Sequence, residues 1–190
     1  KSNFLTDAAL GDLAVGKNTV FWTRGLTPAS WYPPVPPGQE LVQQVGSLVA
    51  LQQATKFGTD GSGGKYSSDP RLRRCGAGVA VVEASGTRFN VTGGLFATVS
   101  GEQTVPRAEL TAVCLVLAVA QAAFITIVVD ATYILRGFRR GPRKQRLAAN
   151  PDLWSRFWEL LAARGGPWRQ YPHRPGSNQR PCRQRRQLPR

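Results

Sequence analysis

The sequence predicts an α/β fold in which a mixed β-sheet is flanked by helices. Three observations predict this class. Residues 77–83 and 88–96 alternate about a short turn, which is typical of an antiparallel hairpin, and 56–62 has the length of a strand before it. Apolar residues recur at helical spacing in 104–118, and 124–129 is a continuous β-rich run. Together these segments predict three antiparallel strands and at least one parallel strand.

Residues 1–55 are predicted to be a proline-rich upstream segment. The run 33–38 contains four prolines, which remove backbone donors and favour an extended connector. An aromatic-lined partner that recognises polyproline is the alternative to a plain spacer. Residues 40–53 carry apolar side chains at roughly helical spacing and are predicted to form a short helix.

The predicted domain covers residues 56–165 and opens with the strand 56–62. A long loop rich in glycine, serine and arginine follows, at 61–74. Its Gly64-Lys65 pair raises the possibility of a phosphate-binding P-loop. That motif needs a glycine at Thr59 and a serine or threonine at Tyr66, so we exclude it.

After the hairpin, Thr104 is the predicted cap of a helix and Pro106 lies in its first turn. The run 124–129 is predicted to be a strand covered on both faces. Residues 110–129 together have the length of a transmembrane helix. Because Gln121 and Thr126 interrupt them and they divide into a helical and a β-rich part, we expect no membrane span.

The sequence Asn150-Pro151-Asp152 predicts the start of the last helix, with a cap, a first-turn proline and a first-turn acid. An apolar stripe follows at helical spacing: Leu153, Trp154, Phe157, Trp158 and Leu161. Residues 166–190 contain no acid and few aliphatic side chains but many arginines, so a basic, disordered tail is predicted.

The net charge of +14 indicates a polyanionic partner, with nucleic acid favoured over a membrane surface. The alternative is an arginine-rich tail that raises the charge of an indifferent domain. The three cysteines have no metal-ligand spacing, which favours a reducing, intracellular location, cytoplasmic or nuclear. The chain begins with Lys1 and contains no methionine, so we expect it to be part of a longer translated product.

Three acids lie where the predicted elements begin or end. Asp60 is near the end of the first strand, Glu109 is near the start of the long helix, and Asp130 follows the run 124–129. Carboxylates placed in this way can converge on one divalent cation. The alternatives are a first-turn acid that complements the helix dipole for Glu109 and a helix cap for Asp130.

Residues 136–146 form a basic run that includes Arg139 and Arg140. A solvated loop is one interpretation. Phe138 among so many cations favours a second one, a patch that contacts a nucleic-acid backbone.

Five motifs in this order resemble those of type 1 ribonuclease H domains, particularly the domains that follow the reverse transcriptase of non-LTR retroelements. The resemblance covers roughly residues 56–165. The motifs are Thr59-Asp60-Gly61-Ser62, the 77–96 hairpin, Pro106-Arg107-Ala108-Glu109-Leu110, Val129-Asp130-Ala131-Thr132-Tyr133 and Asn150-Pro151-Asp152-Leu153-Trp154.

The resemblance implies a ribonuclease H-like mixed sheet, two Mg²⁺ ions and hydrolysis of the RNA strand of an RNA–DNA hybrid. It implies that Asp60 bridges the ions and that Glu109 and Asp130 are further ligands. An upstream polyprotein domain such as a reverse transcriptase is the implied partner besides the hybrid. The residues expected to contact nucleic acid are Ser62, Arg107, Thr132, Arg139 and Arg140.

The chain departs from the family pattern after residue 165. The family continues with a fifth strand, a loop histidine and an aspartate that opens a last helix. Here His173 and Asn178 only faintly match that loop, and Cys182 stands roughly where the aspartate belongs. With the fourth carboxylate absent and the fold incomplete at the C-terminus, activity is expected to be weak or lost. A frame disruption near Trp168 is one hypothesis, and a non-catalytic nucleic-acid-binding module is the alternative function.

Overall fold

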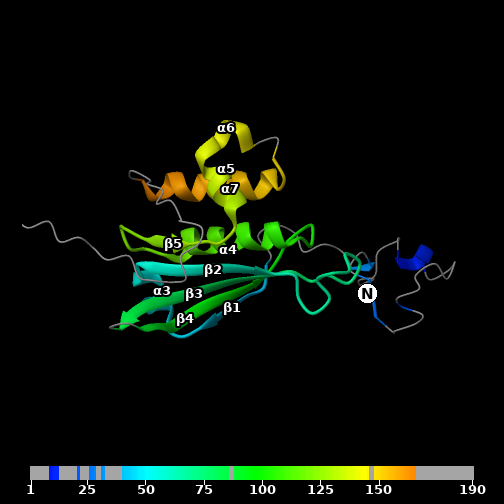
Figure 1. Ribbon diagram of the computed structural model, residues 1–190, viewed down its shortest axis with the longest axis horizontal. Helices are drawn as coiled ribbons and strands as arrows, with labels where there is room; N and C mark the ends of the chain where they lie inside the picture. Colours follow the sequence, from blue (N-terminus) through cyan, green and yellow to red (C-terminus); the bar gives the residue numbers. More distant parts are fainter. Residues whose placement is uncertain are drawn as a thin grey trace, which may run out of the picture.

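The computed structural model describes residues 9–12, 21, 26–28, 31–32, 40–85, 88–145 and 148–165 (Figure 1). The predicted basic tail at 166–190 lies outside the described residues. The elements from residue 40 onward are, in chain order, β1 Val42–Val45, α3 Leu48–Gln53, β2 Lys56–Ser62, β3 Gly76–Ser85, β4 Arg88–Thr98, α4 Val105–Val119, β5 Thr126–Val128, α5 Thr132–Arg140, α6 Pro142–Gln145 and α7 Pro151–Arg164.

The strands form one five-stranded mixed sheet in the order β1-β4-β3-β2-β5. The pairs β2–β3, β3–β4 and β1–β4 are antiparallel, whereas β5 runs parallel to β2. A parallel neighbour requires a crossover connection, and α4 supplies it between β4 and β5. The predicted fold class is therefore confirmed, and the arrangement is consistent with the ribonuclease H-like fold.

Residues 40–53 do not form the single short helix that their spacing predicted. Val42–Val45 is instead an edge strand, paired with β4 so that Val42 faces Ala97 and Val45 faces Gly94. Gly46 then turns the chain with φ of +84°, which glycine adopts without steric cost. The helix α3 that follows buries Leu51 in the core. The sheet thus takes in residues that the predicted boundary at 56 had left in the upstream segment.

The prediction that residues 124–129 form a strand covered on both faces is wrong. Only Thr126–Val128 is a strand, and it lies at the edge of the sheet beside β2. Ile127 packs against the core, but its strand neighbour Val128, on the other face, is 46% exposed. One face of this strand is therefore buried by the helices and the other faces solvent.

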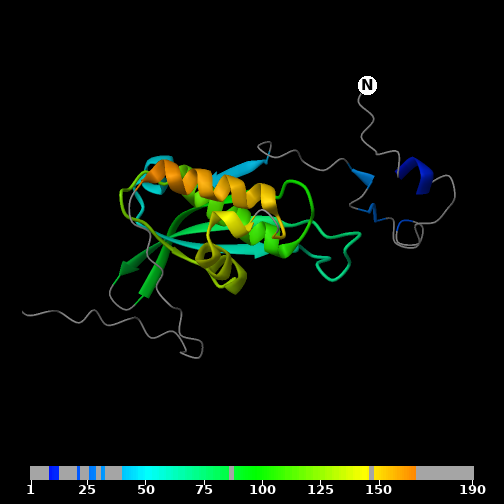
Figure 2. The same cartoon turned by 90° about the horizontal axis from the view of Figure 1, so that it is seen from above.

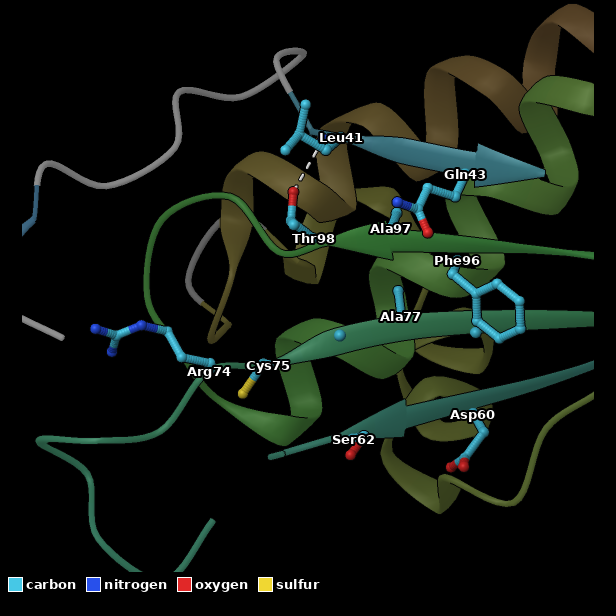
Figure 3. Close-up of a pocket in the computed structure, with 12 residues that line it drawn as sticks. Leu41, Gln43, Asp60, Ser62, Arg74, Cys75, Ala77, Phe96, Ala97 and Thr98 are labelled. Carbon is cyan, nitrogen blue, oxygen red and sulfur yellow. Dashed lines mark hydrogen bonds between the residues drawn. The ribbon is translucent and has the colours of Figure 1, made fainter. Parts of the chain in front are cut away.

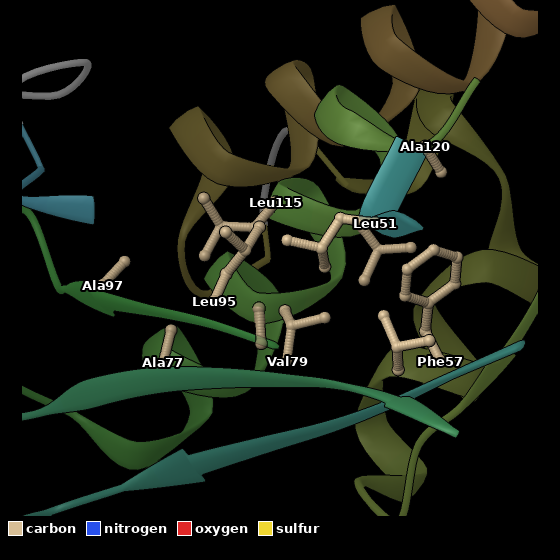
Figure 4. Packing of buried hydrophobic residues seen from close by; sticks show 11 residues of the cluster. Leu51, Phe57, Ala77, Val79, Leu95, Ala97, Leu115 and Ala120 are labelled. Atoms are coloured by element: carbon tan, nitrogen blue, oxygen red, sulfur yellow. The ribbon is translucent and has the colours of Figure 1, made fainter. Parts of the chain in front are cut away.

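The core lies in two layers on one side of the sheet (Figures 1 and 2). The inner layer joins the sheet to α4, with Phe57, Val79 and Leu95 against Leu115 (Figure 4). The outer layer joins α4 to α7 through Leu110, Val113, Cys114 and Leu117 on α4 and Leu153, Trp154, Phe157 and Leu161 on α7. Because it is covered from both sides, α4 is buried around nearly its whole circumference.

The last helix begins where the sequence predicted, with Asn150 before it and Pro151 in its first turn. At its other end Arg164 donates to the carbonyl oxygens of Ala120 and Ala122, just after α4, which fixes the two helices against each other. Within the described ranges, none of the helices combines the length and the apolar character needed to cross a membrane. Residues 110–129 divide between α4 and β5, as their helical and β-rich patterns indicated.

Candidate metal centre

Three elements bring Asp60, Glu109 and Asp130 to one point. β2 carries Asp60 and the parallel β5 is followed by Asp130, so both acids lie at the same end of two neighbouring strands. Glu109 reaches that end from α4, which packs on β2. One carboxylate oxygen from each residue lies within 4.8 Å of the others. The predicted convergence is therefore what the structure contains.

Glu109 is the buried member of this cluster. Its side chain is 7% exposed, and its Oε2 atom is buried and has no hydrogen-bond partner among the described residues. It is the fifth residue of α4, and no acid occupies the helix's first turn, so the alternative of a dipole-complementing surface acid is wrong. A buried carboxylate oxygen without a donor is costly unless a cation meets it. Carboxylate oxygens grouped in this way could hold a hard divalent cation.

The two aspartates form the exposed side of the cluster. The cap of α5 is Ala131, without any side-chain capping bond, so the alternative of a helix-capping role for Asp130 is wrong. Asp60 accepts a hydrogen bond at Oδ1 from the backbone N–H of Gly61, at 2.8 Å. That bond fixes the orientation of the carboxylate and leaves its other oxygen for a cation.

Burial and repulsion act together on Glu109. Burial raises the pKa of its carboxyl most, the charges of Asp130 and Asp60 raise it further, and a backbone hydrogen bond from Gly61 opposes them. The resulting pKa is about 7, against an ordinary value of 4.5. Because the folded pKa lies above the ordinary one, the folded protein holds this proton more tightly. Without metal, the free energy of unfolding should therefore fall as the pH rises from about 4.5 to about 7.

Mg²⁺ affinity should rise between pH 6 and pH 8. A ligand must lose its proton to bind metal, and Glu109, with a pKa of about 7, loses it across this interval. Isothermal titration calorimetry at the two pH values measures the effect, and buffers of different ionisation heat report the proton released. Glu109→Gln should bind Mg²⁺ more weakly and without the pH dependence. Equal Mg²⁺ affinity of the parent at both pH values would contradict this assignment.

The acids can meet because Gly61 lets α4 approach β2 closely. A Cβ atom at Gly61 would lie 2.6 Å from the backbone nitrogen of Glu109 and 2.8 Å from its Cγ. No real Cβ contact is that short, so a side chain there forces the helix away from the strand. Gly58 lies on the same strand, but its Cβ would only touch Val82 Cγ2 at 3.8 Å.

Gly61→Ala should lower the free energy of unfolding by about 1–3 kcal/mol, because the helix must shift to admit the methyl group. It should also weaken Mg²⁺ binding, since the shift moves Glu109 away from the aspartates. Urea unfolding and calorimetry measure the two effects, with Gly58→Ala as the matched control. Equal behaviour of the two variants would show that the close approach at Gly61 has no role.

Arg107, expected to contact the hybrid, lies inside the molecule. It is 5% exposed, and its guanidinium makes a two-pronged ion pair with Asp152 at 2.5 and 2.9 Å. It also donates to the Ser100 carbonyl and, at 3.3 Å, to Asn150 Oδ1. These bonds tie the start of α4 to the start of α7. Contact with a hybrid would require Arg107 to leave them, so its observed role is to hold the helix that carries Glu109.

The other predicted contact residues are exposed. Ser62 ends β2 two residues after Asp60, and its Oγ accepts a hydrogen bond from the Gly64 N–H at 3.1 Å. Thr132 opens α5 two residues after Asp130. Each hydroxyl therefore lies two residues after an aspartate of the cluster. Arg139 and Arg140 lie in the last turn of α5, which Figure 1 places on the helical side of the molecule, above α4.

Sequence reasoning missed two residues that support the cluster. Tyr133 donates its hydroxyl hydrogen to the Pro106 carbonyl in the first turn of α4. Burial and, to a smaller extent, the nearby Glu109 carboxylate raise the pKa of this hydroxyl above its ordinary value. Asp152, predicted only as a first-turn acid, is the partner of Arg107. Both residues lie inside the five motifs quoted for the resemblance, but their partners lie 27 and 45 residues away along the chain.

Comparisons of the chain with protein-family models, curated proteins and solved structures found no match.

Proposed function

We propose that this domain hydrolyses the RNA strand of an RNA–DNA hybrid with Mg²⁺ ions held by Asp60, Glu109 and Asp130. The observation that carries the proposal is the convergence of three carboxylates from three separate elements within 4.8 Å. The buried Glu109 oxygen, which has no hydrogen-bond donor in the part of the chain that the structure describes, supports a cation at this point. The five ordered motifs support the choice of substrate, since it is in them that the chain resembles type 1 ribonuclease H domains.

The side chains divide the work according to their exposure. Glu109 would bind from the buried side, whereas Asp60 and Asp130 face solvent, where a phosphate group can approach. When bound, divalent ions would lower the pKa of a water molecule and stabilise the leaving oxygen. The Ser62 and Thr132 hydroxyls lie two residues after the two aspartates. Each hydroxyl could donate a hydrogen bond to the 2′-hydroxyl that distinguishes RNA from DNA, or accept one from it.

Activity should be weak, because three carboxylates hold two ions less well than four do. The test therefore uses enzyme in excess over a blunt hybrid, with either the RNA or the DNA strand end-labelled. We expect Mg²⁺-dependent shortening of the RNA strand, an intact DNA strand and no reaction in EDTA. If the RNA remains intact with Mg²⁺ and with Mn²⁺ at enzyme excess, the proposal fails.

A second function is favoured by a different observation. Arg136, Arg139, Arg140, Arg143 and Lys144 are all exposed on α5 and α6, and the chain carries a net charge of +14. Such a surface can bind a nucleic-acid backbone without cleaving it. Hybrid binding in EDTA that weakens steeply with salt, together with no cleavage in Mg²⁺, would favour this binding module over the nuclease.

A further inference from the structure

The face of the sheet opposite α4 and α7 is not covered by any helix among the described residues (Figure 1). Antiparallel sheets that face water on one side normally present polar side chains there. This face differs: Phe96, Val91, Val45 and Val128 are all at least 46% exposed on it or at its edges. An exposed apolar surface of this kind usually marks a binding site.

The strand registers show how the face is built. Asp60, Gly78, Phe96 and Gln43 lie side by side across β2, β3, β4 and β1. In Figure 3 the Asp60, Phe96 and Gln43 side chains project on the same side of these strands. Two hollows of about 480 and 520 Å³ adjoin one another here, and both are lined by Asp60, Gly78 and Phe96. Volumes of this size suit a nucleotide or another small molecule.

Phe96 is the distinctive residue of this surface. It is 55% exposed, although a phenylalanine ring is among the side chains that most favour burial. Its neighbour across the sheet, Gly78, presents no side chain to cover the ring. A Cβ atom at Gly78 would meet its closest neighbour, the Asp60 carbonyl oxygen, at 3.7 Å, so packing within the chain does not demand a glycine there. The ring is thus left with an open face.

We propose that this surface, formed by Asp60, Gly78, Phe96, Gln43 and Arg74, binds unpaired nucleotides and stacks one base on Phe96. Exposed aromatic rings on a sheet are the usual platform for unpaired bases, because every base has a flat face. Gln43 and Thr98 line the same hollow and can hydrogen-bond to base edges. Arg74 lines the same hollow. One N–H group of its guanidinium donates to the Arg73 carbonyl, and the guanidinium has further N–H groups that can bond a ligand.

Charge favours nucleic acid over an apolar protein segment as the occupant. Arg74 lines the hollow, where its guanidinium can meet a phosphate, and the chain as a whole carries a net charge of +14. Lys56 lies on the same face as Asp60, since residues four apart in a strand point the same way. A purely apolar partner would cover the polar Gln43 side chain without offering it a hydrogen bond.

The surface also lies at a useful distance from the metal centre. Asp60 and Phe96 are separated by one intervening strand, so their backbones are about 10 Å apart. A single strand covers that distance in about three stacked nucleotides, at about 3.4 Å each. In this respect the inference rests on the proposed function: an unpaired extension of the RNA strand would be held next to the bond that is cut.

Binding of a fluorescent 12-nucleotide single-stranded RNA in EDTA tests the proposal without any cleavage. Anisotropy should be measured at about 0.2 M salt, where backbone attraction is weakened and stacking is easier to detect. Phe96→Ala should weaken binding about tenfold, and Phe96→Tyr should retain it. Phe124→Ala is the matched control, since Phe124 is 83% exposed but lines neither hollow; it should bind as the parent does.

Three results would overturn the proposal. Phe96→Ala could bind RNA as tightly as the parent. Phe96→Leu could bind as tightly as the parent, which would show that apolar contact rather than stacking matters. The parent could self-associate through this face, with the association lost in Phe96→Ala. If the parent does not cleave the hybrid but still binds RNA in a way that depends on Phe96, the proposed function is refuted and this inference stands.

Discussion

Replacement of Asp60 by asparagine should reduce Mg²⁺-dependent cleavage of the RNA strand by at least about 100-fold. Loss of a residue that hydrogen-bonds to a metal ligand already lowers metal affinity or activity by about 10- to 100-fold. Loss of the charge of the ligand itself should lower activity by no less. The shape of the side chain is unchanged, and the asparagine oxygen can still accept the Gly61 N–H bond. Single-turnover cleavage of an end-labelled hybrid measures the change.

The fold should survive this substitution. Three carboxylates close together repel one another without a cation, so removing one charge should leave the metal-free stability unchanged or raise it. Glu159→Gln is the control, because Glu159 is an exposed acid on α7 that accepts a hydrogen bond from Ser155. Cleavage that is detectable in the parent and persists in Asp60→Asn would show that the site is assigned to the wrong residues.

Replacement of Asp152 by alanine should lower the free energy of unfolding by about 2–4 kcal/mol. It leaves the Arg107 guanidinium, whose side chain is 6% exposed, without its charged partner. This loss is somewhat smaller than the about 3–5 kcal/mol typical of broken buried pairs, because the Asp152 side chain is itself 45% exposed. Urea unfolding measures the loss.

The matched control is Asp69→Ala, which breaks the exposed ion pair with Arg71. That pair has side-chain exposures of 52% and 28%, so its loss should cost less than about 1 kcal/mol. Substituting both Arg107 and Asp152 by apolar residues should recover part of the stability, because no buried charge is then left alone. An equal loss in Asp152→Ala and Asp69→Ala would mean that the Arg107 pair does not hold α4 to α7.

Local patterns were sufficient where an element's signal lies within its own residues. The hairpin of β3 and β4, the helix α4 and the start of α7 at Pro151 all follow from alternation, helical spacing and first-turn proline. The acids were found for the same reason, because each stands at or near the end of a recognisable element. Their convergence then followed from the parallel pairing of β2 with β5.

Long-range partners explain what local patterns did not predict. Val42–Val45 is a strand only because β4, about 50 residues later, pairs with it. Arg107 is buried because Asp152 lies opposite it, 45 residues along the chain. The open face of β5 was missed because an apolar run shows that a strand is buried but not on which side. Each of these features depends on a contact made in three dimensions.

The most direct test of the metal centre is a calorimetric titration of Mg²⁺ into the parent and into Asp130→Asn at pH 8. Asp130 is exposed and caps no helix, so this substitution removes a ligand without disturbing the fold. We expect the parent to bind Mg²⁺ and the variant to bind it at least about tenfold more weakly. A parent that binds no Mg²⁺, or a variant that binds it equally well, would contradict the account.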